Sequence, residues 1–331
     1  MSRLRCRRVK FSGALSGGAV FLLWTLGFAP SLSPLHAQAD FVSDSNLLVL
    51  RVTVNDRAGK LIGDLPESDF HVYEDGVPQK LTVFSHEDVP VAVGLVVDNS
   101  GSMRRKLPEV VAAAAAFARS SNPGDRMFVV DFNEHVIEGL PPGDDFVSDP
   151  AELEAAMRRI HAKGETALYD AIAEGLLHIR ESPLQKKVLI VLSDGGDNAS
   201  SRLFPEILSQ VRQSGIIIYT VGLFDEYDTD RNPGVLKELA KASGGEAFFP
   251  QQIPDATGVL QAISRDIRHQ YTLGYVPLNG KHDGTFRNIQ VKLTGPHSGR
   301  WTARTRAGYF APLPAAGQQD AGKQKEGDRT E

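Results

Sequence analysis

Cysteine is almost missing from this 331-residue sequence. Its single cysteine, Cys6, lies in an N-terminal segment, 1–39, that has the composition of an export signal. Without that segment the chain has no thiol, which excludes disulfides and thiol chemistry. We therefore expect a fold that is stabilised mainly by the packing of apolar side chains.

Long apolar runs are also scarce, and only Ala14–Ala29 approaches the length that spans a bilayer. It follows five basic residues (Arg3, Arg5, Arg7, Arg8 and Lys10) and precedes Ala37-Gln38-Ala39, which fits a small-x-small cleavage pattern. We predict that residues 1–39 are a signal peptide cleaved before Asp40, and that the mature protein is periplasmic or extracellular. An uncleaved N-terminal membrane anchor is the alternative.

After the predicted signal peptide (the leader, 1–39), basic residues are fewer than acidic ones. The leader contains five of the 36 basic residues and none of the 41 acidic ones, which leaves 31 basic and 41 acidic residues, a net charge of −10. An acidic chain is a poor match for nucleic acid or for an anionic membrane surface. The charge therefore argues against nucleic acid or a membrane surface as the main partner.

Motifs of the common enzyme classes are absent as well. The sequence has no G-x-S-x-G elbow, no Walker lysine motif and no G-x-G-x-x-G after a predicted strand. Histidines are scattered without the spacing of zinc ligands, as His71, His86, His135, His161 and His178 illustrate. We predict a protein that is not an enzyme.

The hydrophobic pattern changes twice along the chain. Apolar residues alternate with period two in 48–54 and again in 271–275 and 289–293, as in half-buried strands. From 90 to 269, buried strands alternate with amphipathic helices, which predicts an α/β domain with a doubly wound, mostly parallel sheet. The predicted parts are the signal peptide (1–39), an N-terminal β segment (40–88), the α/β domain (89–269), a C-terminal β segment (270–311) and a disordered tail (312–331).

The two flanking β segments are each too small to bury a core alone. In the first segment, 70–73 and 79–84 are predicted to form a hairpin around Glu74-Asp75-Gly76, because Asp-Gly supplies the positive φ that such turns require. The second segment is expected to end with a strand at 301–306. We therefore expect the two segments to pair into one small β-sandwich.

One apolar run ends in a cluster of oxygen-bearing side chains. Residues 91–97 have the composition of a central strand that is covered on both faces, and Asp98-Asn99-Ser100-Gly101-Ser102 follows directly. Open parallel sheets place ligand sites at the carboxyl ends of their strands. Asp98, Ser100 and Ser102 alternate along a tight loop, so their oxygens can turn toward one small divalent cation. Taken alone, the loop is better explained as a helix N-cap.

Two later residues complete a recognisable set. Thr166 lies in Gly164-Glu165-Thr166-Ala167-Leu168, and Asp194 follows another buried strand, 187–192. Together with Asp98-x-Ser100-x-Ser102, and in this order, they resemble the metal-ion-dependent adhesion site (MIDAS) of the von Willebrand factor type A (VWA) fold. The resemblance implies a metal site made of Asp98, Ser100, Ser102, Thr166 and Asp194.

The donor set indicates which metal such a site would take. Few carboxylates and several hydroxyls leave room for water, which suits Mg²⁺ or Mn²⁺ better than Ca²⁺. In the family that the chain resembles, Ser100 and Ser102 would bind the metal directly, whereas Thr166 and Asp194 would exchange direct and water-mediated contact. The open coordination position accepts a carboxylate from a protein ligand, so the resemblance implies adhesion or another protein–protein interaction.

The flanks extend the resemblance. Asp69-Phe70-x-Val72-x-Glu74-Asp75-Gly76, Tyr271-x-Leu273-x-Tyr275 and Arg306-x-Gly308-Tyr309 are similar to secreted bacterial proteins described as VWFA-related. We predict an exported, non-enzymatic binding protein that presents a divalent metal to an acidic residue of a protein partner. One alternative is a structural or assembly component of a cell-envelope complex in which the metal stabilises the fold. Another is a metal-dependent hydrolase that uses Asp98 and Asp194 and still needs a general base.

Two further charged clusters have simpler explanations. An acidic loop contains Asp225, Glu226, Asp228 and Asp230, but Pro233 and Leu239 stand where a calcium loop needs glycine and glutamate. The C-terminal β segment is basic through Arg287, Lys292, Arg300, Arg304 and Arg306. We expect both clusters to be solvated. The alternatives are that the acidic loop tunes ligand contact and that the basic segment contacts an acidic partner.

Overall fold

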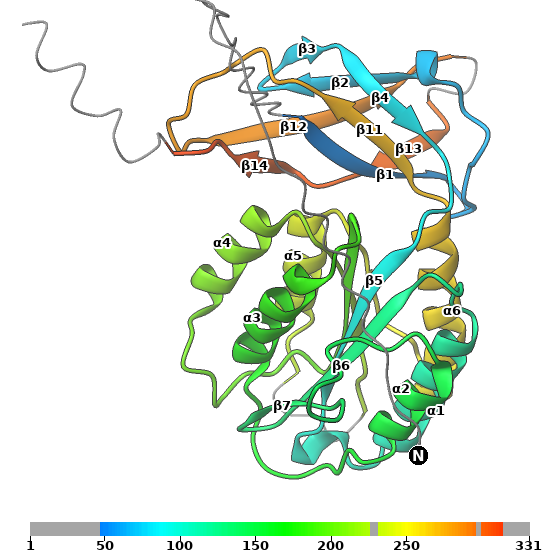
Figure 1. Ribbon diagram of the computed structural model, residues 1–331, viewed down its shortest axis with the longest axis vertical. Coiled ribbons are helices and arrows are strands. Elements are labelled where there is room, and N and C mark those ends of the chain that lie inside the picture. Colours follow the sequence, from blue (N-terminus) through cyan, green and yellow to red (C-terminus); the bar gives the residue numbers. More distant parts are fainter. Residues whose placement is uncertain (1–46, 226–230, 296–298, 314–331) are drawn as a thin grey trace, which may run out of the picture. The chain divides into compact units, whose positions relative to one another are not determined.

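The computed structural model describes residues 47–225, 231–295 and 299–313 (Figure 1). The predicted signal peptide, the chain beyond residue 313 and most of the acidic loop, from Glu226 to Asp230, lie outside them. The described strands form three sheets, one of six strands and two of four. No helix in this part of the chain is long and apolar enough to cross a membrane.

The six-stranded sheet is mostly parallel, which confirms the predicted fold class. Its spatial order is β10 (Ala247–Phe248), β9 (Ile217–Gly222), β8 (Lys186–Ser193), β5 (Val91–Asp98), β6 (Arg126–Phe132) and β7 (Val136–Glu138). Only β6 and β7 pair antiparallel among these strands. β5 lies between β8 and β6, and all eight of its residues are buried. Burial on both faces explains why its sequence is apolar until it reaches Asp98.

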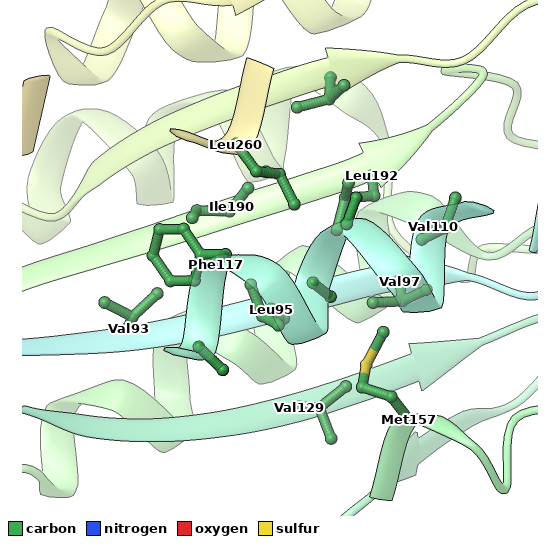
Figure 2. Close-up of a cluster of buried hydrophobic side chains, with 14 of the residues drawn as sticks. Val93, Leu95, Val97, Val110, Phe117, Val129, Met157, Ile190, Leu192 and Leu260 are labelled. Carbon is green, nitrogen blue, oxygen red and sulfur yellow. The ribbon is translucent and has the colours of Figure 1, made fainter. Parts of the chain in front are cut away.

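Helices cover both faces of this sheet (Figure 1). One face carries α1 (Leu107–Arg119), α2 (Pro150–Met157) and α6 (Ala256–Arg268); the other carries α3 (Leu168–His178), α4 (Phe204–Ser214) and α5 (Pro233–Ser243). Side chains of β5 alternate between the two layers, as the pleat of a strand requires. Val93 and Leu95 pack with Phe117 of α1 (Figure 2), whereas Ala92 and Val96 join the cluster on the opposite face.

Short 3₁₀ helices add to the connections between these elements. In the described part of the chain they are η1 (Glu67–Asp69), η2 (Gly101–Met103), η3 (Ile179–Glu181) and η4 (Ile253–Asp255). η2 is the one that bears on function, since it begins inside the Asp98–Ser102 loop. Its backbone turns the chain from the end of β5 into α1.

The two flanking β segments pair with each other, as expected. One sheet has the order β13 (Trp301–Arg304), β1 (Leu48–Asp56), β11 (Tyr271–Tyr275), β4 (Leu81–Ser85); the other has the order β14 (Gly308–Phe310), β12 (Phe286–Leu293), β2 (Phe70–Glu74), β3 (Val77–Gln79). Every neighbouring pair is antiparallel. Val52, Phe70 and Tyr271 belong to one buried cluster that draws on both sheets. Strands from before and after the α/β region thus share a hydrophobic core.

The predicted strand 79–84 is wrong in detail. The hairpin turn forms as expected, with φ of 47° at Asp75 and 81° at Gly76, but its second strand is β3 and ends at Gln79. The chain then passes Lys80 and enters β4, which pairs with β11 in the other sheet. The residues at this point, Gln79-Lys80-Leu81, include no glycine or proline that would mark the change of sheet. A last strand, β14, was also missed, because three residues are too short for a periodicity.

Three motifs of the flanking segments meet inside the sandwich. Glu74 is 2% exposed, and its Oε2 accepts hydrogen bonds from the hydroxyls of Tyr275 (2.8 Å) and Tyr309 (3.1 Å). Burial and the neighbouring Glu74 raise the pKa of both tyrosines above the usual range. The residues that carried the resemblance outside the α/β region are therefore contact partners.

The expectation of a solvated basic face is wrong for two of its arginines. Arg287 is 7% exposed, and its NH2 group donates to both carboxylate oxygens of Asp283 at 2.9 Å. Arg304 donates to the carboxylate of Asp266 and, at 2.8 Å, to the carbonyl of Gly244. The acceptors of Arg304 lie far from it in the sequence, which explains why a sequence pattern did not reveal them.

Candidate metal centre

Asp98 lies at the carboxyl end of the central strand. It is the last residue of β5 and is fully buried, at 0% exposure. The strand can approach its neighbours closely at Gly94, where an added Cβ would lie 2.3 Å from Phe128 Cζ and 2.5 Å from Leu189 Cδ2. Tight packing along β5 therefore fixes where its carboxyl end, and with it Asp98, stands in the sheet.

Both carboxylate oxygens of Asp98 accept hydrogen bonds. Oδ1 accepts from the backbone N–H of Ser100 at 2.9 Å, and Oδ2 accepts from the hydroxyl of Ser193, the last residue of β8, at 2.6 Å. Burial raises the pKa of Asp98 to about 6, and the charge of Asp194 adds to the rise. Asp98 thus holds two loops together and carries a negative charge that nearby protein groups only partly offset.

The hydroxyls of the first loop connect Asp98 to Asp194. Ser100 Oγ and Ser102 Oγ are 3.1 Å apart, and the Ser102 hydroxyl donates to Asp194 Oδ2 at 2.7 Å. Asp194 is 4% exposed and Ser100 is 1% exposed, whereas Ser102 belongs to the exposed residues. The cluster is therefore buried where it faces the sheet and accessible to solvent at Ser102.

Thr166 lies on a loop that contacts the same region through its backbone. The carbonyl of Gly164 accepts from Gly101 N at 3.0 Å, and Thr166 N donates to the side chain of Asn198 at 2.8 Å. Thr166 is 7% exposed. Among the described residues its hydroxyl makes no hydrogen bond with the other four predicted ligands. The structure thus links Asp98, Ser100, Ser102 and Asp194 directly and places Thr166 between the two loops that carry them.

Some residues of this region were missed from the sequence. The Ser193 hydroxyl donates to Asp98. The one local sign of this contact in the sequence is that Ser193 directly precedes the predicted ligand Asp194. Asn198 comes four residues after Asp194, and no periodicity indicates that it holds Thr166. Lys106 is 1% exposed, and its Nζ lies 3.7 Å from Asp194 Oδ2. A lysine just before a helix is usually solvated, so its burial follows from the tertiary structure alone.

The donor set fits a small, hard cation. The carboxylates of Asp98 and Asp194 and the hydroxyls of Ser100 and Ser102 belong to one cluster that is joined through the Ser100 N–H and the Ser102 hydroxyl, and such oxygen ligands leave positions for the water that Mg²⁺ retains. Asp98 and Asp194 repel each other across it, which a cation between them would relieve. Within the described residues no group of three or more histidine, cysteine, aspartate or glutamate side chains is placed to hold a metal. A metal site at Asp98 and Asp194 would therefore need further ligands of another kind, and the hydroxyls of Ser100 and Ser102 are the nearest candidates.

The fold and the cluster together define a class of protein: an α/β domain with a cluster of oxygen-bearing side chains at the carboxyl edge of a doubly wound sheet, where such sheets commonly bind ligands. Residues 93–196 match the family model described as von Willebrand factor type A domain, so the chain contains a VWA domain. This match confirms the resemblance, and the matched segment includes all five predicted metal ligands. VWA domains serve mostly in adhesion and binding rather than in catalysis. A search among curated proteins gives no match.

Solved structures with a similar fold come from several bacteria. BatB from Bacteroides thetaiotaomicron is 19% identical, over 54% of this chain and 97% of BatB, with a TM-score of 0.45. The vWF domain of the type V pili tip protein Mfa5 from Porphyromonas gingivalis is 15% identical, over 54% of this chain and 95% of that domain, with a TM-score of 0.47. A von Willebrand factor type A protein from Catenulispora acidiphila is 16% identical, over 83% of this chain and 76% of its own, with a TM-score of 0.49. At these identities the similarity concerns the fold alone.

Proposed function

We propose that this chain is an exported, non-enzymatic binding protein whose VWA domain presents Mg²⁺ or Mn²⁺ to a carboxylate on a protein ligand. The proposed ligands of the metal are Asp98, Ser100, Ser102, Thr166 and Asp194. The observation that carries the proposal is the hydrogen-bonded cluster of Asp98, Ser100, Ser102 and Asp194 inside the segment that matches the VWA family.

Different residues of the chain would have different roles in such a site. Ser193 and the backbone of Ser100 hold both oxygens of Asp98, so that its carboxylate is oriented before any cation arrives. Ser102 is the exposed member and gives a ligand access from solvent. A bound divalent cation would supply positive charge that attracts an anionic group of the partner. The rest of the mature chain has a net negative charge. We therefore expect the bound cation to be the feature that attracts a carboxylate of the partner.

Magnesium titration by calorimetry tests the metal. We expect wild type to bind Mg²⁺ in the millimolar range or tighter, and Asp98→Ala to lose this binding while it still folds, because Asp194 is then the one carboxylate left in the proposed ligand set and the hydroxyls are neutral. Circular dichroism and a melting curve establish the fold of the variant. Ser120→Ala is the matched control. Ser120 lies at the C-terminal end of α1, away from the Asp98 loop, and its hydroxyl donates a hydrogen bond to the carbonyl of Phe117. Unchanged Mg²⁺ binding in Asp98→Ala would refute the proposal.

A fold-stabilising metal is the second candidate, and the burial of Asp98 and Asp194 favours it, since a cation would relieve their repulsion. The two candidates differ in what a chelator does. A pull-down from the exporting cell, with and without chelator, should release the partner if the metal bridges it. If the metal is structural, the chelator should lower the melting temperature without releasing the partner. A hydrolase would instead show turnover that Asp98→Ala abolishes.

A further inference from the structure

One lysine near the proposed metal centre is buried. Lys106 is 1% exposed, which places it among the most completely buried large side chains of the described chain. Lysine is almost never buried unless a partner compensates for the loss of water, because an ammonium is costly to desolvate. One such partner is Asp194, whose Oδ2 lies 3.7 Å from the Lys106 ammonium.

The backbone fixes Lys106 in this position. Its N–H donates to Met103 O at 2.9 Å, at the end of η2, and its carbonyl accepts from Val110 N at 3.1 Å, in the first turn of α1. The neighbours Met103 and Leu107 are buried, with exposed fractions of 0% and 7%. The lysine therefore belongs to the same hydrogen-bonded connection between β5 and α1 that carries Ser102, four residues earlier.

Lys106 and the proposed metal share one carboxylate oxygen. Asp194 Oδ2 faces the ammonium and also accepts the 2.7 Å hydrogen bond from Ser102. The ammonium offsets part of the negative charge that the site offers to a cation. The same fixed positive charge remains after a cation has bound, and it then adds to the attraction for an anion. Both effects are strong in a buried place, where water screens charges weakly.

We propose that Lys106 sets the charge of the metal centre, weakening its affinity for the divalent cation and strengthening the affinity of the loaded centre for a carboxylate. This inference rests on the proposed function. It assigns to Lys106 opposite effects on two binding steps at one site. A purely structural lysine would not have that pattern, since loss of packing would weaken both steps.

Lys106→Met tests the inference, because methionine has a similar length and no charge. Calorimetry with Mg²⁺, and Mn²⁺ binding followed by electron paramagnetic resonance, should give roughly tenfold tighter metal binding than wild type. Titration of glutarate into the Mg²⁺-saturated protein should give weaker binding than wild type by a similar factor. Lys106→Gln, which also lacks the charge and retains a hydrogen-bond donor, should change both affinities in the same directions and serves if the methionine variant does not fold.

Lys163→Met is the matched control, since Lys163 is a more accessible lysine three residues before Thr166. It removes the same charge at a place where water screens it, so both affinities should stay close to those of wild type. Equal Mg²⁺ affinity in wild type and Lys106→Met, or weaker binding of both Mg²⁺ and glutarate in the variant, overturns the role of Lys106 alone. Absence of Mg²⁺ and Mn²⁺ binding from wild type and variants alike overturns the proposed function as well.

Discussion

At the scale of the residue, burial changes the pH at which Asp98, a proposed metal ligand, loses its proton. Burial raises the pKa of Asp98 to about 6, with the Asp194 charge adding to the rise, and burial likewise raises the pKa of Asp131 to about 6. An unfolded aspartate titrates near pH 4. The folded chain therefore holds protons between about pH 4 and pH 6 that the unfolded chain has released.

Two consequences of opposite sign follow from Asp98. The stability of the metal-free protein should increase as pH falls from about 7 to about 5, while Mg²⁺ affinity should fall by up to about tenfold per pH unit below the pKa of Asp98, since a proton competes with the cation. Urea unfolding without metal and calorimetry with Mg²⁺, each as a function of pH, measure the two effects. Asp98→Asn isolates the contribution of this one group. If the two proteins have the same pH dependence of stability, the raised pKa of Asp98 is wrong.

At the scale of the element, β5 shows how close packing positions the site. Its residues pair with β8 on one side and β6 on the other, and helices cover both faces. Gly94 lies in the middle of this strand, where the side chains of Phe128 and Leu189 fill the space that a Cβ would need. A shift of β5 would move Asp98 relative to Ser193 and so disturb the hydrogen bond between them.

Gly94→Ala should therefore be destabilising, by about 1–3 kcal/mol, because the added methyl group overpacks the core. Mg²⁺ affinity should fall with it as β5 shifts. Gly258→Ala is the control, since no heavy atom apart from the neighbouring backbone of α6 lies within 4 Å of the place that its methyl group would take, and alanine favours helix. Urea denaturation of both variants gives the comparison. A Gly94→Ala protein as stable as wild type would show that the space beside Gly94 accommodates a methyl group, contrary to this prediction.

At the scale of the whole molecule, the two ends of the described chain depend on each other. β1 lies between β11 and β13, so a strand that precedes the VWA segment is paired on both sides by strands that follow it. Asp266 of α6 accepts hydrogen bonds from Thr53 of β1 (2.6 Å), from Tyr219 of β9 (2.9 Å) and from Arg304 of β13. This buried network connects the sandwich to the helices and sheet of the VWA domain. The domain limits at residues 89 and 269 stay predictions.

A chain that ends at His269 tests this dependence. It lacks β11 and β13, so β1 would lose its ladder hydrogen bonds on both edges, and the apolar residues Leu50, Val52 and Val54 would lose their cover. Amide hydrogen exchange should show that residues 48–56 lose protection, while β5 and β8 retain it. Retained protection of 48–56 in the shortened chain would contradict the proposed pairing of the two segments.

The sequence predicted the parts of the fold that follow from local pattern. Apolar runs and helix periods indicated the doubly wound sheet, because a strand covered on both faces must be apolar, and Asp75-Gly76 indicated a turn that positive φ makes possible. The resemblance carried by Asp98, Ser100, Ser102, Thr166 and Asp194 predicted one site, and carboxyl ends of parallel strands share an edge. The structure joins four of these residues by hydrogen bonds, and their role as metal ligands stays a prediction.

The tertiary structure alone decided the contacts between residues that have no common pattern. Lys106 is buried beside Asp194, Ser193 holds Asp98, and Glu74 accepts from Tyr275 and Tyr309 across the sandwich. A charged or hydroxyl side chain carries no periodicity that tells whether it faces water or a distant partner. Its environment is set by which strands and helices come together, and that depends on the packing of the whole chain.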